Sequence, residues 1–243
     1  MKTKTGKLIL LILGGMILLF IIRSPYYDKE STMVESVLID QTDTFLAIPN
    51  VGEVFAPLHI EENKWKSIDL RIQTISNFDY NTVSSLHLEP RLIILSNPAE
   101  RDHEIEFFKH KSDSVIENIK HEEYGKTKSS IYRIIISEAN RLSVINAKIK
   151  SIIVYSDLLE NSSIFSIYNA DSRALLKSDP DQVKKLFEQV IRPGNLQGIS
   201  VHFIFKPKSD MDNEYFLLTS TLFKSILEGA GAKVSIGANL IEN

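Results

Sequence analysis

The chain has 243 residues, of which 43% are hydrophobic and 24% charged, and its formal net charge is −3. This composition is too apolar and too mixed for a disordered or collagen-like chain. The lack of cysteine excludes disulfide frameworks, cysteine-ligated zinc sites, iron–sulfur clusters and thiol nucleophiles.

The N-terminal end is the most apolar part of the chain. A basic segment at residues 1–7 precedes an uninterrupted apolar run at residues 8–22, which Arg23 follows. Fifteen helical residues cover about 22 Å, between the length of a signal-peptide core and that of a spanning helix. Because no small-residue cleavage pattern follows, we predict an uncleaved transmembrane signal-anchor at residues 8–22. A cleaved signal peptide is the alternative.

The charges around this run predict its orientation. Lys2, Lys4 and Lys7 precede the run, and only Arg23 follows it closely. The positive-inside rule then places the N-terminus in the cytoplasm and the rest of the chain on the periplasmic or extracellular side of a single-pass membrane protein. Without residues 1–23, 24 basic residues face 31 acidic ones, a charge of −7. Such a charge argues against a nucleic-acid partner.

Beyond a linker at residues 24–34, residues 35–243 are expected to form one domain. Short β-branched runs alternate there with segments of helical period, which predicts a Rossmann-like α/β domain with a mostly parallel six-stranded sheet. Residues 97–114, which are rich in charge, are expected to be a surface excursion. The expected strands are residues 36–40, 69–76, 91–96, 150–156, 200–205 and 233–236.

Two of these strands end in acidic residues. The first runs into Asp40-Gln41-Thr42-Asp43-Thr44, and the fourth runs into Ser156-Asp157. In parallel sheets, ligands bind beyond the carboxyl ends of the strands, where the strand order reverses. Carboxylates and hydroxyls that meet there suit a hard cation such as Mg²⁺ or Mn²⁺.

The D-x-T-x-T sequence resembles the D-x-S-x-S signature of von Willebrand factor A domains, and the resemblance extends over nearly all of residues 35–238. It implies a three-layer fold of that type with a metal-ion-dependent adhesion site. Asp43 would add negative charge nearby. The metal ligands implied by position are Asp40, Thr42, Thr44, Ser129 and Asp157, with Thr127 and Ser130 as alternatives to Ser129.

The resemblance implies a binding module and no enzymatic activity. A carboxylate of a protein partner would complete the coordination of the metal, as in a subunit of a membrane or envelope assembly. This sequence differs from the pattern in three places, the first being threonine instead of serine at both hydroxyl positions of the first motif. Leu158 follows the last aspartate where glycine is usual, and Pro49, Gly52 and Pro57 interrupt the expected first helix.

Two alternatives remain open. D-x-T-x-T also resembles the nucleophile motif of haloacid dehalogenase-like phosphotransferases. In that hypothesis Asp40 attacks phosphorus, Ser96 holds the phosphate, and Asp157 with Glu160 binds Mg²⁺. Such enzymes place a second aspartate where this chain has Thr42. The other alternative is an α/β structural or interaction domain without metal.

Overall fold

The computed structural model describes residues 32–42, 49–76, 81–121 and 128–240. The predicted signal-anchor at residues 8–22 lies outside these ranges. Within them, no helix has the length and apolar character needed to cross a membrane. The first strand begins at Thr32, inside the segment expected to be a linker.

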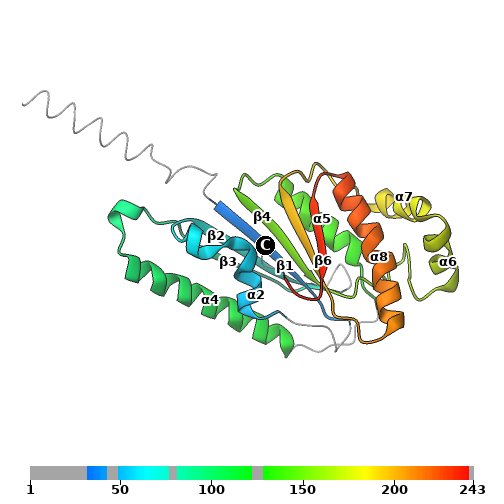
Figure 1. The fold of residues 1–243 in the computed structure, drawn as a ribbon, viewed down its shortest axis with the longest axis horizontal. Coiled ribbons are helices and arrows are strands. Elements are labelled where there is room, and N and C mark those ends of the chain that lie inside the picture. The colour runs from blue at the N-terminus through cyan, green and yellow to red at the C-terminus, as the bar shows by residue number, and fades with distance from the viewer. Residues whose placement is uncertain (1–31, 43–48, 77–80, 122–127, 241–243) are drawn as a thin grey trace, which may run out of the picture.

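The described ranges contain six strands, seven α-helices and two 3₁₀ helices (Figure 1). In chain order they are β1 (Thr32–Asp40), α2 (Val51–Phe55), η3 (Ala56–Leu58), α3 (Ile60–Asn63), β2 (Ser67–Ile75), β3 (Val83–Leu88), η5 (Ile93–Leu95), α4 (Pro98–Lys120), α5 (Ile131–Ser143), β4 (Ile149–Tyr155), α6 (Ala170–Ser178), α7 (Pro180–Val190), β5 (Ile199–Ile204), α8 (Asp210–Gly229) and β6 (Lys233–Gly237).

The strands form one sheet in the order β3-β2-β1-β4-β5-β6. Every neighbouring pair is parallel except β2 and β3, which are antiparallel. The predicted α/β fold with a mostly parallel six-stranded sheet is therefore confirmed. The order 3-2-1-4-5-6 reverses direction between β1 and β4, and this is the switch point at which doubly wound folds bind ligands.

Helices cover both faces of the sheet and make three layers (Figure 1). The central strand β1 is buried on both faces, so its apolar side chains alternate between two cores. Val34 and Leu38 pack with α5, α7 and α8 in what we call the α5-side core. Met33 and Val37 pack with α2, α3 and α4 in the α4-side core.

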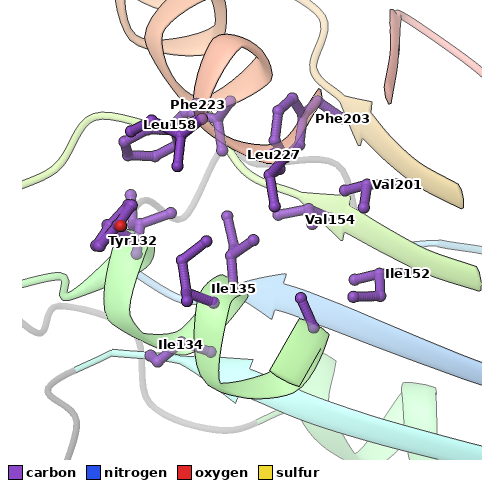
Figure 2. Packing of buried hydrophobic residues seen from close by; sticks show 14 of the residues in the cluster. Tyr132, Ile134, Ile135, Ile152, Val154, Leu158, Val201, Phe203, Phe223 and Leu227 are labelled. Carbon is purple, nitrogen blue, oxygen red and sulfur yellow. The ribbon is translucent and has the colours of Figure 1, made fainter. Parts of the chain in front are cut away.

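The α5-side core is the larger of the two. Figure 2 shows α5 and α8 meeting over β4 and β5, with Ile135, Val154 and Phe223 among the buried side chains. Helix α5 has its apolar residues three and four positions apart, and this stripe faces the sheet. The helical periods predicted around Ile131–Leu142 and Phe216–Leu227 are thus confirmed.

Two expectations for the middle of the chain are wrong. Residues 91–96 do not form the third strand, because Ile93–Leu95 is an exposed 3₁₀ turn. The third strand is Val83–Leu88, an edge strand with polar residues on its open side, so it lacks the continuous apolar run of a central strand. Residues 98–120, expected in part as a surface excursion, form α4, whose inner side buries Ile105, Phe108 and Ile116.

The expected interruption of the first helix is confirmed. Helix α2 ends at Phe55, Pro57 lies in the 3₁₀ turn η3, and α3 begins only at Ile60. The break passes through His59, whose φ of 44° is left-handed. These short pieces still bury Val54, Phe55 and Leu58 in the α4-side core.

Candidate functional site

The carboxyl ends of β1 and β4 lie side by side at the switch point. Ile39 of β1 pairs with Tyr155 of β4, so the next residues, Asp40 at the end of β1 and Ser156 just after β4, lie side by side. Both side chains are buried, with about 1% exposed. The parallel register therefore places a carboxylate and a hydroxyl next to each other at the position where such folds bind ligands.

Asp40 is held by short hydrogen bonds from two segments. The Thr42 backbone N–H (3.0 Å) and the Thr42 hydroxyl (2.7 Å) donate to Oδ1. The Ser156 hydroxyl donates to Oδ2 at 2.7 Å. Three donors on a buried carboxylate favour its ionised form. The Thr42 and Ser156 hydroxyls direct their protons at Asp40, and Ser156 Oγ also accepts the Leu158 N–H, which leaves it one further lone pair.

The turn after β4 is built around Asp157. The Leu159 N–H donates to Asp157 Oδ1 (2.9 Å), and the Leu158 N–H donates to Ser156 Oγ (2.9 Å). Leu158 adopts a left-handed φ of 57° although its side chain is fully buried. This is the position where the resemblance implies glycine, and a leucine there carries about 1 kcal/mol of backbone strain.

Ser129 is buried beside the same turn. Its hydroxyl donates to the Leu159 carbonyl at 3.2 Å, and its backbone forms a two-way bridge with Asn161 (3.2 and 3.1 Å). The next residue, Ser130, is the N-cap of α5 and makes no side-chain capping bond. Ser129 is thus the residue whose hydroxyl contacts the Asp157 turn, while Thr127 lies outside the described residues.

Glu160 is a second buried carboxyl close to Asp40, and the metal-site prediction did not include it. Its Oε2 accepts the Tyr132 N–H at 2.9 Å and so caps α5, whereas Oε1 has no hydrogen-bond partner within the described ranges. Burial raises the pKa of Glu160 to about 7, the Ser162 hydroxyl and the α5 amides oppose the rise, and the Asp40 charge adds to it. Glu160 is therefore partly protonated at neutral pH.

The C-terminal end of α4 also reaches this edge. The Gln41 side-chain amide donates to the Ile119 carbonyl (3.4 Å), and the Gln41 backbone N–H donates to the Ile75 carbonyl (3.2 Å). Four segments therefore converge on the carboxyl end of β1: the turn after β4, the residues before α5, the end of β2 and the end of α4.

The predicted metal ligands can now be placed. Asp40 and Thr42 are hydrogen-bonded to each other, and Ser129 and Asp157 belong to one buried turn cluster beside them. Thr44 and Asp43 lie outside the described residues. In the parts of the chain that the structure describes, no group of three or more His, Asp or Glu side chains is close enough to hold a metal by itself.

The donors that are present suit Mg²⁺ nevertheless. They are all oxygens, two of them are hydroxyls with free lone pairs, and Glu160 supplies a buried carboxyl oxygen without a partner. A site of this kind would hold the ion through few direct bonds and several waters, as Mg²⁺ prefers. When bound, the ion would offer a coordination position to an incoming carboxylate.

Ser96 is far from Asp40, although the phosphotransferase hypothesis needs the two together. Ser96 precedes α4, whose 23 residues span about 34 Å. The C-terminal end of that helix contacts Gln41, next to Asp40. Its N-terminal end contacts Lys66 and Glu89, which lie at the opposite end of the strands, where the parallel strands begin. Ser96 therefore cannot hold a phosphate that is bound to Asp40.

Sequence reasoning did not include Ser156 and Glu160 among the candidate metal ligands. The register of β1 and β4 would have indicated Ser156, because two parallel strands that end together place their next residues side by side. Glu160 had no comparable signal, since its capping of α5 depends on how the 157–161 turn folds. Comparison with models of known protein families gives no match, and comparison with curated proteins gives none either.

Proposed function

We propose that this chain is a membrane-anchored protein-binding module with a von Willebrand factor A-type domain. Residues 8–22 would anchor it in the membrane, and a divalent metal at the Asp40 site would capture a carboxylate of the partner. The observation that carries the proposal is the convergence of Asp40, Thr42, Ser129 and Asp157 on the switch point.

The chemistry of the site favours binding over catalysis. Asp40 accepts three short hydrogen bonds, which hold its carboxylate in place and reduce its nucleophilicity. Ser96, the residue that would hold a phosphate, is at the opposite edge of the sheet. The hydroxyls of Thr42 and Ser156 are positioned to contact a cation directly, while the carboxylates balance its charge through water.

A metal titration of the detergent-solubilised full-length chain tests this proposal. At 100 times Kd, Mg²⁺ or Mn²⁺ should stabilise the fold by about 2.7 kcal/mol, which corresponds to a rise in Tm of roughly 5–10 °C for a domain of this size. Asp40→Asn and Asp157→Asn should each abolish the rise. Asp181→Asn, at an exposed position on α7, should keep it.

Other results would reject the proposal in distinct ways. Absence of any rise with either ion in the wild-type chain favours the metal-free interaction domain. Hydrolysis of a generic phosphate ester that is lost in Asp40→Asn would favour the phosphotransferase instead. A chain that alkaline carbonate extracts from membranes would reject the anchor and leave the metal result standing.

A further inference from the structure

Three consecutive apolar residues project into solvent at one end of the molecule. Ile93, Ile94 and Leu95 form η5 and are 67%, 94% and 76% exposed, and we call them the apolar tip. Single exposed apolar side chains are common, but a run of three on a turn is not what water-facing turns carry. A contiguous apolar surface of this kind marks a contact with a partner or a membrane.

The apolar tip is held firmly in this exposed position. The Arg91 N–H donates to the Trp65 carbonyl at 3.0 Å, and the Leu95 N–H donates to the Leu92 carbonyl at 3.1 Å. Buried Arg101 then joins the start of α4 to the carbonyls of Lys64, Lys66 and Glu89 at 2.7–2.9 Å. The fold therefore fixes the tip outside the core.

The tip lies at the edge where the parallel strands begin, which we call the N-terminal edge. Trp65, whose carbonyl accepts the Arg91 N–H just before the tip, lies two residues before Ser67. Ser67 pairs with Thr32 at the start of β1. In Figure 1 the turn between β3 and α4 lies at the same end as the start of β1. Exposed Val144 also lies at this edge, because it is the C-cap residue of α5 and precedes β4.

Two lysines without acidic partners lie on the same edge. Lys66 precedes β2, and Lys148, whose N–H donates to the Thr32 carbonyl at 2.9 Å, precedes β4. Burial and, to a smaller extent, the neighbouring Lys148 together lower the pKa of Lys66 to about 8. Among the described residues neither lysine forms an ion pair. An anionic group between them would relieve this repulsion.

Two acidic residues near the tip are already paired, whereas exposed Glu100 in the first turn of α4 forms no ion pair among the described residues. Glu104 binds Arg91 and Arg101, and Asp102 binds Lys64. Among the basic residues at this part of the N-terminal edge, Lys66 and Lys148 are left without an acidic partner in the described ranges. Apolar side chains, a tryptophan and unpaired lysines on one surface are the combination found where proteins meet a lipid interface.

The chain itself brings this edge to the membrane. Nine residues, 23–31, separate the apolar run from the first residue of β1. Fully extended, they reach about 30 Å, so the start of β1 cannot move farther than this from the end of an anchor at residues 8–22. The N-terminal edge is the part of the domain nearest that attachment.

From these observations we propose that the N-terminal edge rests on an anionic lipid surface. The apolar tip inserts among the headgroups, and Lys66 and Lys148 bind lipid phosphates. The inference depends on the proposed anchor and adds an orientation to it. The Asp40 site, at the opposite edge of the sheet, then faces away from the bilayer toward a partner.

The absence of cysteine allows a direct test with single labels. The full-length chain carrying Ile94→Cys, labelled with an environment-sensitive fluorophore, is reconstituted in vesicles of phosphatidylcholine with an equal amount of phosphatidylglycerol. We expect a blue shift at position 94 and quenching by nitroxide-labelled lipid. Met211→Cys, exposed at the start of α8 and the opposite edge, should show neither.

The lysines are tested in the Ile94→Cys background. Lys66→Gln and Lys148→Gln should each lower the ratio of docked to undocked domain by about fivefold in the anionic vesicles. Lys185→Gln, exposed on α7, should leave the ratio unchanged. If the docked fraction is the same with and without phosphatidylglycerol, no lysine–phosphate contact exists and that part of the proposal fails.

The remaining outcomes separate this inference from the anchor. A chain that resists carbonate extraction but shows no more quenching at position 94 than at 211 is anchored with its N-terminal edge free, which overturns the inference alone. A label at 94 that is shielded in native membranes but not in pure lipid vesicles would show that a protein covers the tip, and this too overturns it.

Discussion

Ser156 Oγ donates a 2.7 Å hydrogen bond to Asp40 Oδ2 and joins the ends of β1 and β4 across the switch point. The two residues are far apart in the sequence, so their contact depends on the parallel register of β1 and β4. The bond both orients the Asp40 carboxylate and compensates for its burial.

Loss of this hydroxyl should destabilise the domain. In Ser156→Ala, Asp40 loses one of its donors and the Leu158 N–H loses its acceptor. We expect the free energy of unfolding in denaturant titrations to fall by about 2–3 kcal/mol. Ser163→Ala, an exposed serine of the following loop, should change it by no more than about 0.5 kcal/mol. Equal effects of the two changes would show that the Ser156 contact is not stabilising.

Glu160 should make the domain less stable as pH rises. Its pKa is raised from 4.5 to about 7 in the folded chain, so between these values the folded state holds a proton that the unfolded state has lost. Stability therefore falls with increasing pH through this window, by up to about 3 kcal/mol.

The measurement is the free energy of unfolding of the wild-type chain minus that of Glu160→Gln, followed from pH 4.5 to pH 7. The difference should decrease as pH rises, because the variant has no group to titrate there. The exposed Glu62→Gln controls for the same chemical change. Parallel curves for the wild type and Glu160→Gln would contradict the raised pKa.

Glu35 should be a destabilising residue at neutral pH. It lies in the middle of β1 with its side chain fully buried, and neither carboxyl oxygen has a hydrogen-bond partner among the described residues. Burial raises the pKa of Glu35 well above its usual range, and the neighbouring Ser151 hydroxyl opposes the rise. Glu35→Met replaces the carboxyl with an apolar side chain of similar volume.

We therefore expect Glu35→Met to raise the free energy of unfolding by about 1–3 kcal/mol at neutral pH. The gain should grow from pH 5 to pH 8, because over this range the unfolded wild type loses the Glu35 proton that the folded state still holds. Thermal melts at both pH values measure it, with exposed Glu61→Met as the control. A lower Tm in Glu35→Met at pH 8 would show that the carboxyl stabilises β1.

Arg101→Ala should destabilise the α4-side core strongly. The side chain is 1% exposed and binds three backbone carbonyls and Glu104. Its removal leaves these acceptors buried without donors, for which we expect a loss of about 3–5 kcal/mol in denaturant titrations. His110→Ala, on the exposed side of α4, should have little effect. A loss below about 1 kcal/mol would mean that water replaces the guanidinium.

The sequence predicted the central strands better than the edge. Strands β1, β4 and β5 lie inside the sheet and are mostly buried, so their β-branched and apolar residues are easy to recognise. Strand β3 lies at the edge of the sheet, and the adjacent Ser84 and Ser85 interrupt its alternation of apolar and polar residues, which leaves a weak pattern. The run at residues 92–95 is more apolar, but it includes an exposed 3₁₀ turn and forms no strand.

The candidate site, too, could be predicted from the sequence only in part. Asp40 and Asp157 could be chosen from the sequence, because acids after central strands are easy to locate. The direct Ser156–Asp40 contact requires the register of two strands that are more than a hundred residues apart. The burial of Glu160 requires the left-handed turn at Leu158, which leucine does not signal. Long-range pairing and local strain are not encoded in residue patterns.

The course of β1 has a mechanical consequence. This strand runs from Thr32, the residue nearest the predicted anchor, straight to Asp40, and it pairs in parallel with β2 over nine positions and with β4 over seven. A pull between a partner held at Asp40 and the N-terminal end acts along the strand. The covalent backbone of β1 would carry this force, so the hydrogen bonds to β2 and β4 would not lie in its direct path. A force between the predicted anchor and the Asp40 site would thus pass along one strand of about 30 Å and leave the rest of the sheet largely unloaded.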